Sequence, residues 1–253
     1  MRFYRKNNLL FLAFENLGRF PELAHGVFTR NGGHSDGPFA KLNVGRSVGD
    51  AEDAVWRNRD AISRCMDDAP IAWLHQVHGT EIEAISGEAA PDAEPPKADG
   101  AITADTNRLL AIQVADCQPV MLYDPKHRAI ANLHAGWRGS IGNIIAAGIE
   151  TMKNRFGTDP KDIVAGIGPS LGPCCAEFIH YRDEIPEAYW KYRDAENRFD
   201  FWRISRDQLT AAGVRSGNIE LAGICTRCNP HLFFSYRHAN TTGRFTAIIG
   251  LRG

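Results

Sequence analysis

Three side chains that can bind a transition metal follow strand-like runs of the sequence, at the point where each run ends. His78 lies in HQVHGT, Cys117 in VADCQP and His134 in NLHAGWRG. Two imidazoles and one thiolate are a ligand set of catalytic zinc sites, in which three protein ligands leave the fourth tetrahedral position open. Since strand ends converge in a folded sheet, we expect these residues to form a zinc site, with copper as the alternative metal.

A second histidine, His75, competes with His78 for the metal, because HQVH places the two three residues apart. On a strand these positions point to opposite faces, so both can bind one ion only if the chain turns between them. We favour His78 as the ligand because Gly79 permits a bend. His75 is then expected to pack, or to hydrogen-bond to a metal ligand.

Two charged residues flank the predicted ligands. Asp116 directly precedes Cys117 and is expected to orient a ligand or to act as a general base, provided that the strand has already ended there. Asp116, Cys117 and His134 form the predicted catalytic set. Downstream of His134, Arg138 and the backbone N–H groups that open the next helix suit an anion such as phosphate or a carboxylate.

The other cysteines are expected to be reduced thiols, because no secretory signal accompanies them. Cys65 lies within a helical pattern and is predicted to be a small buried apolar residue. Cys174 and Cys175 follow a Gly/Pro loop, and Cys225 and Cys228 have the CxxC spacing of zinc ribbons and redox proteins. A four-cysteine metal site is one interpretation, but a single CxxC is a weak signal, so we assign both pairs structural roles.

The composition of the 253 residues, with 43% hydrophobic and 23% charged, is typical of a globular protein. A formal net charge of -1 gives no electrostatic reason to expect a nucleic acid or anionic lipid as partner. No apolar run approaches the roughly 18 residues that span a bilayer. The short apolar run near the start is interrupted by Glu15 and lacks a cleavage site. We therefore expect a cytoplasmic protein whose irregular N-terminus leads into a first strand.

Apolar periodicity predicts one α/β or mixed α+β domain over residues 1–253, without a linker. Helices are expected at 51–66, after an N-cap at Asp50, and at 141–156 and 204–214. Continuous apolar runs between residues 101 and 135 are typical of sheets covered on both faces. Residues 87–100 are predicted to be a loop within the domain. Strands are expected at 25–30, 71–77, 80–86, 101–104, 109–116, 119–124, 128–135, 163–168, 219–224 and 245–251.

The sequence resembles the YfiH-like family, also called the laccase-domain or multicopper polyphenol oxidoreductase-like family, over nearly its whole length. The resemblance rests on TRNGGHS, LNVGRSVGD, AVWRNR, HQVHGT, VADCQPV, NLHAGWRG, IGPSLGPCC and FFSYRH…TGR, in this order. It implies an α/β fold with mixed central sheets flanked by helices. It also implies a zinc site made by the His of QVHG, the Cys of ADC and the His of HAGWRG, which are His78, Cys117 and His134.

The resemblance further implies phosphorolysis of adenosine, inosine, guanosine and methylthioadenosine, with adenosine deamination at the same site. Purine nucleosides and phosphate are therefore the expected ligands, and Asn43, Arg46 and Asp116 the expected polar partners of phosphate, ribose or base. Some bacterial relatives are instead described as peptidoglycan editing factors. The sequence departs from the commoner family pattern at RNGG, GRSVGD and CCAEF, which affects the pocket contacts at Arg46 and Ala176.

Three other interpretations remain open. With Cys117 as nucleophile and His134 as base, the protein would be a hydrolase of amide bonds, such as those of cell-wall precursors. A copper oxidase also fits a His2Cys set, but none of the nine histidines forms the His-x-His pairs of a laccase trinuclear cluster. A scaffold protein with structural zinc would place four protein ligands on the metal.

Overall fold

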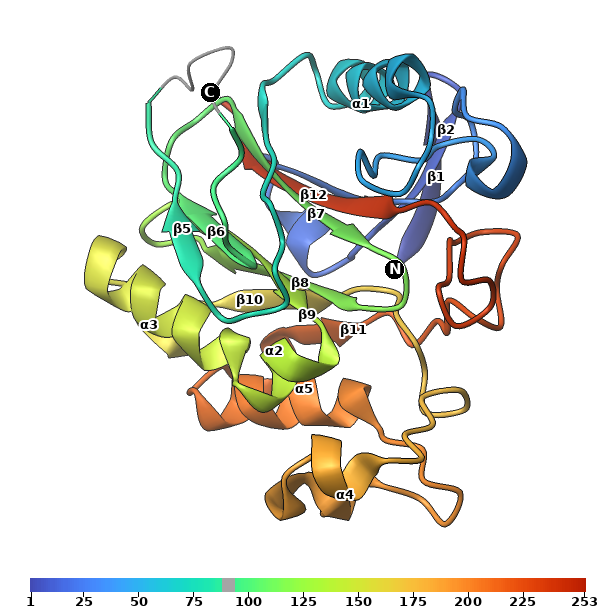
Figure 1. The fold of residues 1–253 in the computed structure, drawn as a ribbon. Coiled ribbons are helices and arrows are strands. Elements are labelled where there is room, and N and C mark those ends of the chain that lie inside the picture. Colours follow the sequence, from blue (N-terminus) through green and yellow to red (C-terminus); the bar gives the residue numbers. More distant parts are fainter. Residues whose placement is uncertain (88–93) are drawn as a thin grey trace.

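The computed structural model describes residues 1–87 and 94–253, in which two six-stranded sheets pack face to face between helices (Figure 1). Helix α1 (Glu52–Cys65) covers the outer face of the first sheet, and α3 (Ile144–Phe156) and α5 (Phe201–Ala211) cover that of the second. The predicted mixed α/β class is confirmed. The predicted loop at 87–100 lies partly outside the described residues.

The first sheet has the order β1-β2-β3-β12-β7-β4, and all neighbours are antiparallel except the parallel pair β4–β7. The expectation of an irregular N-terminus was wrong, because β1 and β2 form a hairpin. Asn7 and Asn8 have φ values of 50° and 64° at its turn, the conformation that a tight hairpin requires and that asparagine tolerates. The strands are Arg2–Lys6, Leu9–Ala13, Leu23–Phe28, Phe245–Leu251, Arg108–Val114 and Ile71–Ala72.

The second sheet has the order β11-β10-β8-β9-β6-β5, with parallel pairs at its two edges and antiparallel pairs in its centre. These strands are Ile219–Leu221, Val164–Ile167, Gln118–Asp124, Ala129–Ala135, Gly100–Thr103 and Ile82–Ala84. Every strand predicted by its apolar run is present, most of them shorter than expected by one to five residues at the ends. The sheet brings the turn before β8 and the end of β9 to one edge.

Apolar residues on both faces of the central strands explain the continuous apolar runs. In β7, Leu110 and Ile112 pack between the two sheets, whereas Leu109 and Ala111 pack beneath α1. The same alternation holds in β8. Met121 and Tyr123 pack between the two sheets, whereas Val120 and Leu122 pack beneath α3 and α5. Because successive strand residues point to opposite faces, a strand between two apolar layers is apolar at every position.

The predicted helix at 141–156 is divided in the structure. Helix α2 (Trp137–Ile141) ends at Gly142, and α3 begins after Asn143, which has φ 60° and accepts a hydrogen bond from Ala146 N–H. The predicted N-cap of α1 also differs, because Ala51 occupies that position and Asp50 instead accepts a hydrogen bond from Ala51 N–H. A four-residue helix, α4 (Tyr181–Glu184), lies in the segment before α5. No helix of the described residues is long and apolar enough to cross a membrane.

The strand predicted at 71–77 pairs only over Ile71–Ala72. Further along, the side chain of Gln76 takes the place of a paired backbone: its Nε2 donates to Gln113 O and its Oε1 accepts from Gln113 N–H, both at 2.9 Å. The main chain of this segment therefore stands away from β7 and is free to turn at His78.

Candidate metal centre and its cavity

The structure brings His78, Cys117 and His134 together from three separate turns and strand ends. Their ligand atoms all lie within 4.8 Å of one another, and the two imidazole rings are 4.9 Å apart between centroids. His78 has φ 62°, in the turn between β4 and β5, and Cys117 follows Asp116 at φ 87°, between β7 and β8. The bend that was expected next to Gly79 thus occurs at His78 itself.

Asp99, in the segment before β6, holds two of these turns by its carboxylate. Its Oδ1 accepts a hydrogen bond from His134 Nδ1 at 2.7 Å and from His78 N–H at 2.9 Å. Its Oδ2 accepts from the N–H groups of Val77 and Gly79. Burial opposes ionisation of Asp99, but the hydrogen bonds from His134 and Gly79 hold the pKa of its carboxyl below the usual value.

The charge states of Cys117 and His134 depend on each other. Burial raises the pKa of the Cys117 thiol, but the charge of His134 and hydrogen bonds from His134 and His78 lower it to about 6. Burial lowers the pKa of His134, but the Cys117 thiolate and the Asp99 carboxylate raise it to about 9. Without a metal, both shifts favour the pair of thiolate and imidazolium over the neutral thiol and imidazole. A metal cation replaces the proton as the partner of both.

Gly136 lies directly against the three side chains. A Cβ atom on this glycine would stand 3.3 Å from Cys117 Sγ and from His78 Cδ2, and 3.5 Å from His134 Cε1. Its φ of -67° is accessible to any residue, so glycine is needed here for space rather than for backbone conformation.

The three residues line a cavity of about 980 Å³. Its walls carry aromatic rings of Trp73, Trp137, Phe178, Phe201 and Tyr236. This volume and mixture of apolar and polar groups are typical of small-molecule sites, which measure about 300–1,000 Å³. His75 also lines the cavity but is not part of the three-residue cluster.

Arginine side chains supply positive charge to the same cavity. Arg59 packs over Trp73, with its guanidinium carbon 3.9 Å from the ring centroid, and burial together with the charge of Arg46 lowers its pKa to about 9. Arg244 is lowered in pKa by burial, against the opposing charges of Cys117 and Asp116. Among the residues described here, neither Arg59 nor Arg244 has a carboxylate within salt-bridge distance. Arg59 donates to Val44 O, and Arg244 donates to Thr242 O and Gly243 O. The remaining N–H groups of each guanidinium can bind an anionic ligand.

Asp116 lines the cavity, but its carboxylate is engaged elsewhere. Oδ1 accepts a hydrogen bond from Thr226 Oγ1 and Oδ2 from Arg237 N–H, both at 2.6 Å. Its carbonyl oxygen accepts from Leu171 N–H at 2.8 Å. The carboxylate that contacts a predicted metal ligand is that of Asp99, which the sequence did not single out.

The three predicted anion and sugar contacts have different positions. Arg46 is exposed, lines the cavity and pairs with Glu52 at 3.0 Å. Asn43 is fully buried and is not among the lining residues; its Oδ1 accepts hydrogen bonds from Gly45 N–H and Arg244 N–H. Arg138 is exposed, lies over the ring of Trp137 and is likewise absent from the lining. Of these residues, the structure thus brings only Arg46 to the cavity.

The fold and the two-histidine, one-cysteine cluster together define an α/β protein with a metal-ligand set inside a substrate-sized cavity. The family described as multi-copper polyphenol oxidoreductase laccase matches residues 24–252, and the chain belongs to this laccase-domain family.

Relatives with similar sequences cover most of the chain. A protein of Bacteroides thetaiotaomicron named purine nucleoside phosphorylase is 35% identical over 247 residues, covering 89% of this chain and 90% of the relative. The purine nucleoside phosphorylase YlmD of Geobacillus stearothermophilus is 36% identical over 245 residues, covering 90% and 89%. The crystal structure of the hypothetical protein YfiH of Bacillus licheniformis superposes with a TM-score of 0.89 at 31% identity, covering 99% of both chains.

Proposed function

We propose that this chain is a zinc-dependent purine nucleoside phosphorylase that acts on adenosine, inosine, guanosine and methylthioadenosine and also deaminates adenosine. The proposal rests on the convergence of His78, Cys117 and His134 in a cavity that also presents aromatic rings and guanidinium groups. The names of the relatives support the nucleoside and phosphate as substrates.

The donor set fits zinc. Asp99 engages Nδ1 of His134 and so leaves Nε2 for a metal, which is the usual arrangement of a carboxylate, a histidine and zinc. Together with His78 and Cys117, this makes three protein ligands. Zinc bound by these three ligands would leave a fourth position for water or substrate and would supply Lewis-acid chemistry there.

The remaining residues bind and orient the substrates. The purine base packs between aromatic side chains of the cavity, such as Trp73 and Phe178, and phosphate binds to the guanidinium groups of Arg59, Arg244 and Arg46. Asn43 supports this site indirectly, through the hydrogen bond that it accepts from Arg244 N–H. Each carboxylate oxygen of Asp116 keeps a lone pair beyond its hydrogen bond from Thr226 or Arg237, and with it Asp116 acts as the general base or binds ribose.

Replacing Cys117 by alanine tests the metal mechanism. The variant is expected to lose the zinc ion of the cavity site and, with it, inosine phosphorolysis, because the remaining two histidines bind zinc weakly. Zinc is measured by mass spectrometry and phosphorolysis by phosphate-dependent release of hypoxanthine. An unchanged circular dichroism spectrum shows that the fold is intact. Full phosphorolysis in Cys117→Ala would exclude the proposal.

Two arginine variants locate the phosphate. Arg244→Gln is expected to raise the KM for phosphate at least about tenfold, since a charge-assisted contact contributes about 1.5–3 kcal/mol, and to leave zinc bound. Adenosine deamination requires no phosphate and is expected to suffer less. Arg138→Ala examines the position predicted from the sequence alone. If Arg138→Ala has the larger effect on the KM for phosphate, the anion binds outside the cavity lining and the assignment to Arg244 is incorrect.

A cysteine hydrolase is the second candidate function, favoured by the lowered pKa of Cys117 beside His134. A thiolate and an imidazolium are the reactive pair of cysteine hydrolases, including those that would act on amide bonds of cell-wall precursors. The metal content of the site at His78, Cys117 and His134 separates the two functions. A chain purified without stoichiometric metal, whose Cys117 reacts rapidly with iodoacetamide, would be assigned to the hydrolase class.

A further inference from the structure

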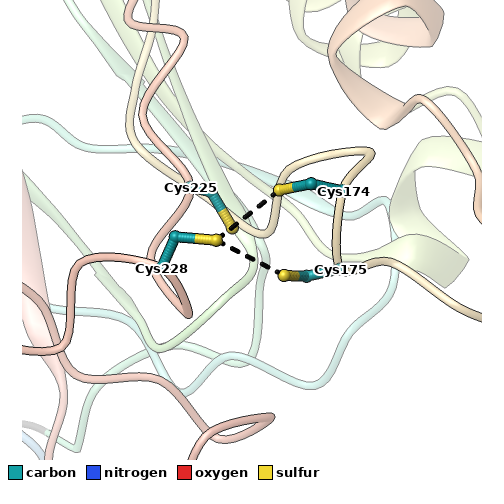
Figure 2. A group of neighbouring side chains, drawn as sticks. All are labelled: Cys174, Cys175, Cys225 and Cys228. Atoms are coloured by element: carbon teal, nitrogen blue, oxygen red, sulfur yellow. Dashed lines mark hydrogen bonds between the residues drawn. The ribbon is translucent and has the colours of Figure 1, made fainter.

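Four cysteines outside the cavity form a second cluster of metal-ligand type. Cys174 and Cys175 lie in the loop after β10, and Cys225 and Cys228 in the loop after β11. Their sulfur atoms all lie within 4.8 Å of one another, and Figure 2 shows the four side chains directed towards a common centre. None of the four is among the residues that line the cavity. The cluster is therefore separate from the site at Cys117.

The spacing of the sulfur atoms is that of a metal-thiolate site. Cys228 Sγ lies 3.7 Å from Cys174 Sγ and 3.6 Å from Cys175 Sγ. A disulfide requires about 2.05 Å between sulfur atoms. Four thiolates at about 2.3 Å from a tetrahedral zinc ion are separated from one another by about 3.8 Å. The observed distances agree with the tetrahedron and exclude a disulfide in this conformation.

The two cysteine loops are held in register by their own backbones. Ser170 N–H donates to Ile224 O at 3.2 Å, and Thr226 N–H donates to Ser170 O at 3.0 Å. Gly172 N–H donates to Cys225 Sγ at 3.3 Å. Hydrogen bonds from the backbone to a ligand sulfur are typical of metal-thiolate centres. These bonds bring Cys225 beside the loop that carries Cys174 and Cys175.

We propose that Cys174, Cys175, Cys225 and Cys228 bind one zinc ion that fastens these two loops together. Four protein ligands complete the tetrahedral coordination, so this ion has a structural role and takes no substrate. The proposal does not depend on the reaction catalysed in the cavity.

The position of the cluster gives this zinc an effect on the cavity. The loop that carries Cys174 and Cys175 also contains Leu171, whose N–H donates to Asp116 O at 2.8 Å. The loop with Cys225 and Cys228 contains Thr226, whose hydroxyl donates to Asp116 Oδ1 at 2.6 Å. Both loops thereby contact the residue next to Cys117. The zinc ion positions Asp116 by holding the two loops at a fixed separation.

Zinc analysis of the full-length chain tests the proposal. The wild-type protein is expected to contain about two zinc ions per chain, one in each site. Cys228→Ser and Cys174→Ser alter exposed ligands, and each is expected to lower the zinc content by about one ion. Cys65→Ala, which changes a cysteine buried beneath the first sheet, is the matched control and is expected to keep both ions.

The Cys117→Ala background separates this proposal from the proposed function. That variant is expected to retain about one zinc ion, which Cys228→Ser then removes. Replacing this ion by Co²⁺ is expected to produce an intense thiolate-to-cobalt absorption, as four sulfur ligands require. Unchanged zinc in Cys228→Ser and Cys174→Ser would overturn the proposal. A protein mass that is lower than that of the fully reduced chain by two or four hydrogen atoms, which indicates disulfides among the four cysteines, would also overturn it.

Discussion

One buried carboxylate, Asp99, connects the two histidines of the proposed metal centre. It accepts a hydrogen bond from the side chain of His134 and three from the backbone of residues 77–79. Both the tautomer of His134 and the conformation of the turn at His78 therefore depend on a single side chain. Such supporting groups commonly change metal affinity by about 10- to 100-fold when they are replaced.

Asp99→Asn is therefore expected to weaken zinc binding at the cavity site by about 10- to 100-fold. The substitution keeps the size of the side chain but turns one acceptor oxygen into an N–H donor, which then faces N–H groups. Zinc affinity is measured by competition with a chromophoric chelator. Phosphorolysis at limiting zinc is expected to fall in parallel.

Asp124→Asn is the matched control for this variant. Asp124 is also fully buried and also contacts a histidine, His127, at 2.7 Å, but neither residue lines the cavity. Its replacement is expected to lower stability without changing zinc affinity. Equal effects of the two substitutions on zinc affinity would mean that Asp99 acts only through the stability of the fold.

The sequence singles out the three candidate metal ligands, which the fold brings together, but it does not single out the residue that supports them. His78, Cys117 and His134 follow strand-like runs and are marked by glycine or aspartate, so their convergence follows from strand ends meeting. Asp99 reaches His134 only because β6 pairs with β9 in one particular register. Arg59, which the sequence analysis also did not single out, lies against Trp73 because of the way in which α1 packs. Contacts of this kind depend on how elements pack, which local patterns do not specify.

At the scale of secondary structure, the backbone conformation of Asn143 separates α2 from α3. Asn143 has φ 60°, which L-residues other than asparagine and aspartate rarely adopt, and its side chain accepts a hydrogen bond from Ala146 N–H at 3.2 Å. Apolar periodicity continues through this position, so the sequence indicated one helix.

Two substitutions of Asn143 distinguish its backbone conformation from its cap. Asn143→Gly retains the left-handed conformation and loses only the side-chain acceptor, and is expected to destabilise the protein by less than about 1 kcal/mol. Asn143→Ala also places a Cβ in the left-handed region, which adds about 1–2 kcal/mol. Urea denaturation measures both. Equal losses in the two variants would show that the backbone conformation contributes nothing.

At the scale of the whole molecule, the two sheets could not be assigned from the sequence. The mixed α/β class follows from the succession of apolar runs, but β12 at the C-terminal end pairs with both β3 and β7. These partners lie more than a hundred residues away along the chain, and each run is equally apolar. The choice of partners and the face-to-face packing depend on the joint fit of many side chains, which no single segment encodes.

The packing of β3 and the segment before it against the second sheet encloses a histidine whose neutral form is favoured. His25 Nε2 accepts a hydrogen bond from Phe14 N–H at 3.0 Å, and its ring stacks on that of Phe14. Burial lowers the pKa of His25 from 6.5 to about 4, against the smaller opposing effects of the Phe14 carbonyl oxygen, 3.2 Å from Nε2, and of Glu220. Protonation would leave a charge in the core.

This histidine predicts a specific loss of stability in acid. The unfolded chain binds a proton at His25 below about pH 6.5, whereas the folded chain does so only below about pH 4, so the free energy of unfolding falls as the pH falls between these values. The difference between these two pKa values corresponds to a loss of about 3 kcal/mol in the free energy of unfolding, nearly complete at pH 4. His25→Gln keeps an acceptor for Phe14 N–H but does not titrate. Carboxylates elsewhere contribute equally to the pH dependence of both proteins. The free energy of unfolding, measured in urea from pH 8 to pH 4, is therefore expected to fall less in His25→Gln than in the wild type, by up to about 3 kcal/mol. Equal declines in the free energy of unfolding of the two proteins would show that His25 becomes protonated in the folded state at little cost, because β3 opens and admits water to the core.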